Sequence, residues 1–292
     1  MTQPIIGVIG GSGLYQMDGL KNMREVAVAT PFGKPSDKLV RGKLGDSELV
    51  FLPRHGKGHR LLPTEVNYRA NIFAMKKLGV ERIISVSAVG SLRAEIAPGH
   101  LVVPDQFIDR TSQRPSTFFG KGLVAHVSLA DPFCKHLSGV LAESAEPAGA
   151  TVHRGGTYVC MEGPQFSTRA ESHLYRSWGA QVIGMTNLQE AKLAREAEIC
   201  FATLALATDY DCWNEQAGDV DIDSVLAVLQ NNVALARRTI GAAVGLLTAQ
   251  RDCNTQRDCN CATALKDAII TDRRLIPRKL RQDLKPIIGK YL

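Results

Sequence analysis

The sequence predicts an α/β sandwich whose ligand-binding loops gather at the ends of its strands. Short apolar segments alternate along the chain with longer segments of helical periodicity, a pattern typical of an open sheet covered by helices. Small polar loops follow several of the apolar segments, where such folds hold their ligands. Nothing before about residue 250 resembles a linker, so we expect one domain over residues 1–250 and an extension over residues 251–292.

The predicted strands are short and apolar, and the one at 200–207 is apolar enough to be buried on both faces. They cover residues 5–9, 49–52, 82–86, 101–103, 157–160, 181–183 and 200–207. The predicted helices cover residues 66–78, 167–178, 190–197 and 222–247, and the last is long enough to cover one whole face of the sheet. Ser167 is the expected cap of the second helix.

Composition indicates a soluble globular chain, with 45% hydrophobic and 22% charged residues. No segment reaches the length of uncharged apolar sequence that a membrane span needs. The N-terminus has neither a basic region nor a cleavage site. We therefore expect a cytoplasmic protein without membrane contact.

The net charge of +6 resides in the last twenty residues, where seven basic residues accompany one acid. Such an extension can contact phosphate backbones or an acidic partner, can be solvated, or can pack on a neighbouring subunit. No recognition motif accompanies it, so nucleic acid is not an expected partner. The basic residues are Arg273, Arg274, Arg278, Lys279, Arg281, Lys285 and Lys290.

Three of the seven cysteines lie in the extension, at Cys253, Cys259 and Cys261. With a further ligand they could chelate zinc, or they could form redox-active bridges, but Cys-x-Cys is not the spacing of common zinc sites. We predict no metal ion and, in a cytosolic protein, free thiols. Whether Cys134 and Cys200 form a bridge stays open.

Three loops are suited to an anion. Glycines around Ser12 let backbone amides approach a ligand, and Arg54 with His55 offers a guanidinium beside an imidazole. Ser87 and Ala88 supply another hydroxyl and amide. Taken singly, the first loop could be a tight structural turn and the second a basic surface loop, but together the three loops predict a phosphate pocket.

Two carboxylates, Asp209 and Asp211, follow the buried strand at 200–207. If the chain stays extended there, residues i and i+2 point to one side and address the same small molecule. One acid can then remain ionised while the other, with a raised pKa, donates a proton. The alternative is a solvated turn.

Further segments offer groups suited to a nucleoside. Phe166 can stack on a flat heterocycle, and Met185 with Thr186 adds a soft apolar group and a hydroxyl. A core phenylalanine and a core methionine are the alternatives for each residue alone. The combination predicts a nucleoside bound beside phosphate.

Several blocks resemble those of the 5′-methylthioadenosine phosphorylases, members of the trimeric purine nucleoside phosphorylase superfamily. The resemblance runs in order from about residue 5 to 250, through residues 10–14, 30–37, 53–56, 66–71, 105–111, 130–134, 162–164 and 207–213. It implies a three-layer sandwich with a mixed central sheet flanked by helices. It also implies phosphorolysis of methylthioadenosine to adenine and 5-methylthioribose 1-phosphate, by a homotrimer or dimer of trimers with orthophosphate as co-substrate and no cofactor.

The resemblance also implies roles for individual residues. Phosphate would be held by Ser12, Arg54, His55, Ser87, the Ala88 backbone and Thr186. The ribose and base would meet Met185, Phe166, Ser167, Asp209, Tyr210 and Asp211. The methylthio pocket would be lined by Ile222, Val225 and Leu226 and reached by His126 of a neighbouring subunit, although core packing also explains the helical spacing of the first three.

The implied chemistry suits these residues. A protonated Asp209 would donate to purine N7, and an acceptor on Asp209 or Asp211 would read the exocyclic 6-amino group. Gln165 departs from the arginine that usually follows Glu-Gly-Pro in the family, which puts a charge contact there in doubt. The alternatives are an adenosine- or inosine-preferring phosphorylase, against which the apolar Ile222 argues, and a non-catalytic nucleoside-binding or tail-mediated interaction protein.

Overall fold

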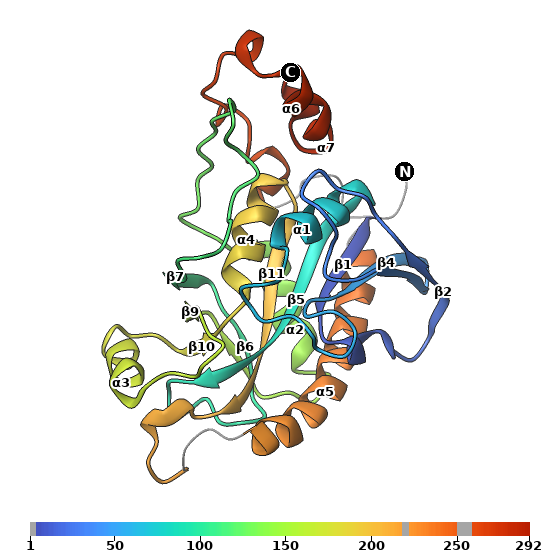
Figure 1. Cartoon of the computed structure of the whole chain (residues 1–292). Helices are drawn as coiled ribbons and strands as arrows, with labels where there is room; N and C mark the ends of the chain where they lie inside the picture. Colours follow the sequence, from blue (N-terminus) through green and yellow to red (C-terminus); the bar gives the residue numbers. More distant parts are fainter. Residues whose placement is uncertain (1–3, 218–221, 250–258) are drawn as a thin grey trace.

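A mixed sheet of eleven strands forms the centre of the protein (Figure 1). The structure is a computed structural model and describes residues 4–217, 222–249 and 259–292. Strand order along the main path is β2-β3-β4-β1-β5-β10-β9-β7, while β11 pairs with β5 and β6, and β6 pairs with β8. The strands are β1 (Ile5–Gly10), β2 (Leu20–Val26), β3 (Leu39–Leu44), β4 (Ser47–Pro53), β5 (Val80–Ser91), β6 (Leu101–Val103), β7 (Gln106–Arg110), β8 (Val152–Arg154), β9 (Thr157–Met161), β10 (Val182–Gly184) and β11 (Cys200–Asp209).

β5 and β11 lie side by side through the middle of the sheet (Figure 1). They run parallel to each other, and β5 also runs parallel to β1 on its other edge. The last residues of β5 pair with β10 in the antiparallel sense. Two parallel strands with buried side chains therefore end close together, and this end of the sheet carries the site described below.

Helices cover both faces of the sheet, which makes three layers. α1 (Tyr68–Lys77) and α4 (Asn187–Glu196) contact each other and pack on one face. α2 (Lys135–Ala145) and α5 (Ile222–Ala249) pack together on the other. Side chains of β11 alternate between the layers, since Phe201 joins the core under α1 and α4 and Leu204 joins the core under α2 and α5.

The C-terminal segment packs on the α1 face of the same chain (Figure 1). Its short helices, α6 (Arg278–Asp283) and α7 (Lys285–Ile288), place Leu284 and Ile288 in the core beneath α1. Buried Glu198 accepts the backbone N–H of Leu265 and forms an ion pair of 2.6 Å with Lys290. Residues 259–292 are thus anchored to the body by buried side chains and do not form a fully solvated extension. The domain division at residue 250 stays a prediction.

The α/β sandwich with a mixed sheet is confirmed, and every predicted strand and helix is present. Two predicted details are wrong. Residues 87–91, expected as a loop, continue β5 because pairing with β10 and β11 keeps them extended. Thr168, and not Ser167, caps α3 (Arg169–Ser177), where it forms a capping box with Glu171. Among the described residues, no helix combines the length and apolarity needed to cross a bilayer.

Candidate active site

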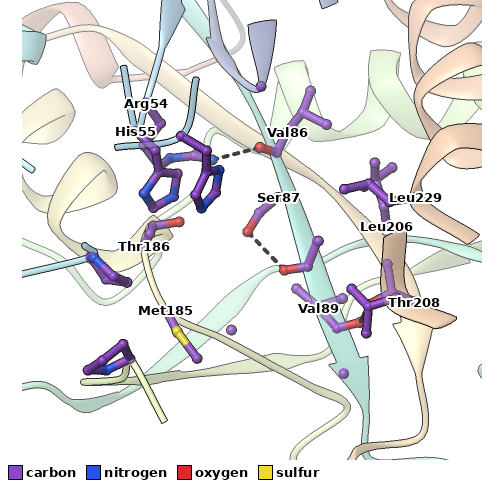
Figure 2. A pocket seen from close by; sticks show the side chains of 18 of the residues that line it. Arg54, His55, Val86, Ser87, Val89, Met185, Thr186, Leu206, Thr208 and Leu229 are labelled. Atoms are coloured by element: carbon purple, nitrogen blue, oxygen red, sulfur yellow. Dashed lines mark hydrogen bonds between the residues drawn. The ribbon is translucent and has the colours of Figure 1, made fainter. Parts of the chain in front are cut away.

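A cavity of about 480 Å³ lies where β5, β10 and β11 end (Figure 2). Loops after β1 and β4 close one side, the start of α4 closes another, and the first turns of α5 close a third. Of the residues predicted from the sequence, the cavity brings together Arg54, His55, Ser87, Ala88, Phe166, Met185, Thr186, Asp209, Asp211, Val225 and Leu226. Carboxylates, a guanidinium and an apolar wall therefore share one space large enough for a small molecule.

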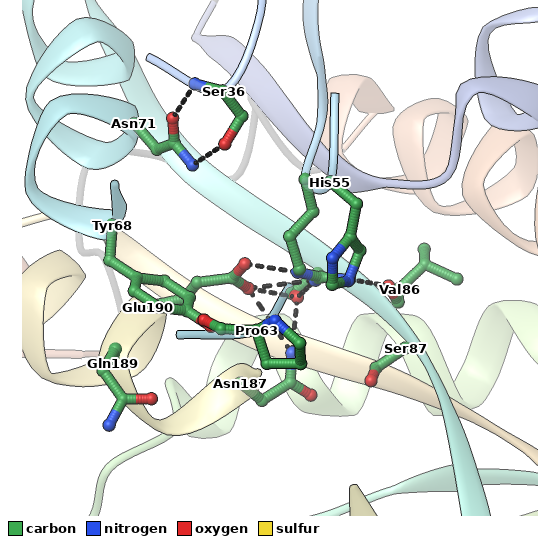
Figure 3. Close-up of polar contacts among 12 residues, drawn as sticks. Ser36, His55, Pro63, Tyr68, Asn71, Val86, Ser87, Asn187, Gln189 and Glu190 are labelled. Carbon is green, nitrogen blue, oxygen red and sulfur yellow. Dashed lines mark hydrogen bonds and ion pairs between the residues drawn. The ribbon is translucent and has the colours of Figure 1, made fainter. Parts of the chain in front are cut away.

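Arg54 lines the cavity, and most of its guanidinium is already engaged by the Glu190 carboxylate and the Val86 carbonyl, two residues labelled in Figure 3. Its Nε and Nη2 pair with the Glu190 carboxylate at 2.5 and 3.1 Å, and both side chains are almost fully buried. Nη2 also donates to Ser85 and Nη1 to the Val86 carbonyl. The further N–H on Nη1 has no partner among the described residues, so Arg54 can offer a ligand one oriented donor while its charge is balanced from behind.

His55 is a neutral imidazole at pH 7. Burial, followed by the positive charge of Arg54, lowers its pKa to about 4. Nδ1 lies 2.8 Å from the Leu61 carbonyl, which can only accept, so we assign the ring proton to Nδ1. The ring stacks on His59 with 4.3 Å between centroids. Nε2 is then left as an acceptor, suited to a protonated oxygen of a bound anion.

Thr186 places the N-terminus of α4 at the cavity. It is the N-cap residue of that helix, yet its hydroxyl makes no capping hydrogen bond. Helix N-termini present free N–H groups and a partial positive charge, which favour anions. Ser87, on β5, lies across from Thr186 (Figure 2). The Ser87 hydroxyl is 3.3 Å from Tyr158 Oη. The side chain of Ser12 lies outside the described part of the chain.

Asp209 and Asp211 both face the cavity, but the chain between them is not extended. β11 ends at Asp209, and Asp211 has a positive φ of 50° at the start of a 3-10 turn. The predicted i, i+2 geometry is therefore wrong. The turn folds back so that the backbone N–H of Asp211 donates to Asp209 Oδ1 at 2.8 Å, and this bond fixes the Asp209 carboxyl against the turn that carries Asp211.

The pKa values of both carboxyl groups are raised. Burial raises the pKa of Asp209, although hydrogen bonds from Thr208 and Asp211 oppose the rise. Burial also raises the pKa of Asp211, and the neighbouring Asp209 charge adds to the effect. Oδ2 of Asp211 is buried and has no hydrogen-bond partner among the described residues. A ligand with a donor group would satisfy it.

The other residues that we expected to contact a base differ in whether they line the cavity. Phe166 is partly exposed and lines the cavity, as does Met185. Ser167 and Tyr210 are absent from the cavity wall. The Ser167 carbonyl instead lies 3.2 Å from the Cys212 sulfur, and Tyr210 packs edge to face against Trp213. Phe166 and Met185 thus stay candidates for direct contact, and Ser167 supports the turn that carries Asp211.

An apolar wall comes from α5, through Val225, Leu226 and Leu229. Leu226, although apolar, is about half exposed in the part of the chain that the structure describes. The side chain of Ile222 lies outside the described residues. His126 is exposed in the loop after β7 and does not line the cavity of its own chain.

Sequence reasoning missed two charged residues that hold the site. Glu190 accepts hydrogen bonds from Arg54, Ser85 and Asn187. Arg114 is fully buried, pairs with Glu162 at 2.8 Å and donates to the Met185 carbonyl, so it joins the Glu162 loop to the start of α4. Glu190 shares a helix face with Leu193 and Ala194, at i+3 and i+4, and this signal could have revealed it, since a buried carboxylate needs a cation.

The fold and cavity agree with comparisons to known proteins. Residues 5–244 match the model of the phosphorylase superfamily. The S-methyl-5′-thioadenosine phosphorylase of Geobacter sulfurreducens is 62% identical over 99% of this chain and 100% of its own length. That of Koribacter versatilis is 56% identical over 99% and 97%.

Solved structures agree. A methylthioadenosine phosphorylase from an antarctic soil metagenomic library superimposes with a TM-score of 0.91 at 49% identity, covering 98% of this chain and 99% of the other. A Schistosoma mansoni adenosine/methylthioadenosine phosphorylase variant, solved with methylthioadenosine, gives 0.80 at 38% identity, covering 85% and 92%. The chain belongs to the phosphorylase superfamily and, within it, to the S-methyl-5′-thioadenosine phosphorylases.

Proposed function

We propose that this protein cleaves S-methyl-5′-thioadenosine with orthophosphate, giving adenine and S-methyl-5-thio-α-D-ribose 1-phosphate for methionine and purine salvage. One observation carries the proposal. A single cavity has anion-binding groups at one end, two carboxyls of raised pKa at the other, and an apolar wall beside them. A nucleoside and a phosphate present the complementary groups.

Phosphate binds at the end formed by Arg54, His55, Ser87, the Ala88 backbone and Thr186, with Ser12 completing it. The Nη1 donor of Arg54 and the N-terminus of α4 supply hydrogen bonds to its oxygens. Neutral His55 accepts a hydrogen bond at Nε2 from the protonated oxygen of the anion. The bound phosphate is then the nucleophile and forms the new bond to C1′ of the ribose.

The base leaves at the end of the cavity that holds the Asp209 and Asp211 carboxyls. As the N-glycosidic bond breaks, its electron pair moves to the purine, and a protonated Asp209 donates to N7. General acids of this kind contribute roughly 10²–10⁴-fold. The unpartnered Oδ2 of Asp211 accepts from the 6-amino group. A 6-oxo purine offers no donor there and leaves a buried acceptor unpaired, which disfavours inosine.

The apolar wall sets the preference at C5′. Val225 and Leu226 contact the methylthio group, and Ile222 belongs to the same face by helical spacing. The open end beside Leu226 is closed by a neighbouring subunit that contributes His126, in a homotrimer or a dimer of trimers. The enzyme acts in the cytoplasm and requires no cofactor.

The test is adenine release from methylthioadenosine with and without orthophosphate, beside adenosine, inosine and methylthioinosine. Phosphate-dependent release that favours methylthioadenosine is the expected result. A preference for inosine would contradict the roles of Asp209 and Asp211. No cleavage of any nucleoside would refute the proposed activity.

A further inference from the structure

Four cysteines from separate parts of the chain converge at the end of β11 opposite the cavity. Cys200 begins β11, Cys134 precedes α2, and Cys259 and Cys261 come from the C-terminal segment. Their four sulfur atoms all lie within 4.8 Å of one another. The sulfurs of Cys200 and Cys259 are 3.5 Å apart. The Cys-x-Cys spacing alone does not predict a group of four thiols this compact.

The separations fit one tetrahedral metal ion. Zinc bound to thiolates at about 2.3 Å in a tetrahedron separates the sulfurs by about 3.8 Å. A disulfide requires about 2.05 Å, well below the 3.5 Å between Cys200 and Cys259. An iron–sulfur cluster places iron and sulfide between its cysteines and needs wider spacing. The cluster therefore has room for a single ion bound by all four sulfurs.

A cationic side chain lies beside the sulfurs. Arg195 Nη1 lies 3.8 Å from the Cys261 sulfur. Such outer contacts orient metal ligands and offset the negative charge that a four-thiolate zinc site carries.

The cluster is accessible from solvent. A second cavity of about 390 Å³ is lined by Cys134, Cys259 and Cys261 together with Lys135 and Arg195. Cys259 is only partly buried, whereas the other three cysteines are buried. An ion can therefore reach the sulfurs in the folded protein, and it would be sheltered from bulk water once bound.

We propose that Cys134, Cys200, Cys259 and Cys261 bind one Zn²⁺ through four thiolates, releasing their protons to solvent. The role is structural, because no coordination position stays open for a substrate and the site lies at the far end of β11 from Asp209. The ion ties residues 259–261 to the body of the protein. The proposal departs from the expectation of no metal ion, because Cys134 and Cys200 supply ligands that sequence spacing does not reveal.

The first experiment uses the full chain, expressed and purified in the presence of a reductant. In a parallel sample, the thiols are alkylated before the cells are lysed. We expect about one zinc per chain by elemental analysis. Removal by a chelator should lower the melting temperature, and added Zn²⁺ should restore it. Co²⁺ added to the metal-free chain should give the charge-transfer and ligand-field bands of a tetrahedral thiolate site.

The second experiment compares Cys259→Ser with Cys212→Ser, a cysteine outside the cluster. Cys259→Ser should lower zinc content at least about fivefold and abolish the Co²⁺ bands, while Cys212→Ser should keep both. Reduced wild-type protein that binds neither Zn²⁺ nor Co²⁺ overturns the proposal. So does the finding of two disulfides among the four cysteines in the sample alkylated before lysis. Both refuting results leave phosphorolysis untouched.

Discussion

Gly90, on β5, keeps space open for the paired carboxyls, so Gly90→Ala should impair catalysis. A Cβ at this position would lie 2.9 Å from Asp209 Oδ1, 3.2 Å from Ile183 and 3.3 Å from the Asp211 side chain. Ordinary contact begins at 3.4 Å, so Asp209 must retreat by about 0.5 Å. A misplacement of about 1 Å can cost 100-fold in rate, and half that distance corresponds to roughly tenfold, or about 1.4 kcal/mol of barrier.

The assay is steady-state adenine release from methylthioadenosine at saturating phosphate, followed by a phosphate titration. We expect kcat to fall about tenfold while the KM for phosphate changes less than about twofold, because Arg54 and Thr186 bind at the other end of the cavity. Gly139→Ala is the control, since a Cβ on Gly139 in α2 meets nothing within 4 Å. A Gly90→Ala enzyme with wild-type kcat and melting temperature would refute this placement of Asp209.

Three further predictions concern carboxyl groups. Asp209→Asn should lose roughly 10²–10⁴-fold in kcat on methylthioadenosine and gain relative preference for 6-oxo nucleosides, measured as the ratio of kcat/KM values. An unchanged ratio would contradict the proposed recognition of the base by Asp209. Glu190→Gln should destabilise the fold by about 3–5 kcal/mol, because it leaves Arg54 buried without a counterion. Added phosphate should raise the melting temperature of this variant more than that of the wild type. Equal melting temperatures of variant and wild type without phosphate would count against a stabilising ion pair. Burial raises the pKa of Glu196 from 4.5 to about 7, so the free energy of unfolding should fall by about 3 kcal/mol as pH rises from about 4.5 to about 7. In thermal melts across this pH range, Glu196→Gln should flatten the dependence. Parallel curves for variant and wild type would contradict the raised pKa.

The parts of the fold that the sequence predicted are those with strong local patterns. The apolar run at 200–207 has no polar interruption other than Thr203, and it became the buried central strand β11. β2 escaped prediction because its side chains are largely exposed and carry charges in irregular order, as Lys21 and Arg24 show. Edge strands of this kind are held by pairing with a neighbour, and that neighbour is not visible in a local window.

The site was predicted where single loops carry the chemistry and missed where distant residues meet. Arg54 and His55 stand together in one loop, so their residue types were enough to mark them. Glu190 matters only because α4 brings it to Arg54, 136 positions earlier in the chain. Asp209 and Asp211 do line one cavity, but the turn that joins them depends on a positive φ that an aspartate adopts at a cost, which periodicity alone does not predict.

In the mechanism we propose, phosphate acts as both nucleophile and countercharge, and the pairing of Arg54 with Glu190 bears on how it can do both. A phosphate held by unpaired cations would be strongly neutralised, which would lower its reactivity and its ability to stabilise positive charge on the ribose. Here Glu190 balances Arg54, His55 is neutral, and Thr186 offers a helix N-terminus with only partial charge. Such a site fixes the anion by oriented N–H and O–H donors while leaving most of its charge directed at C1′. Preorganised dipoles of this kind stabilise a transition state without neutralising the reactant, which explains why a buried carboxylate stands behind the arginine of an anion site.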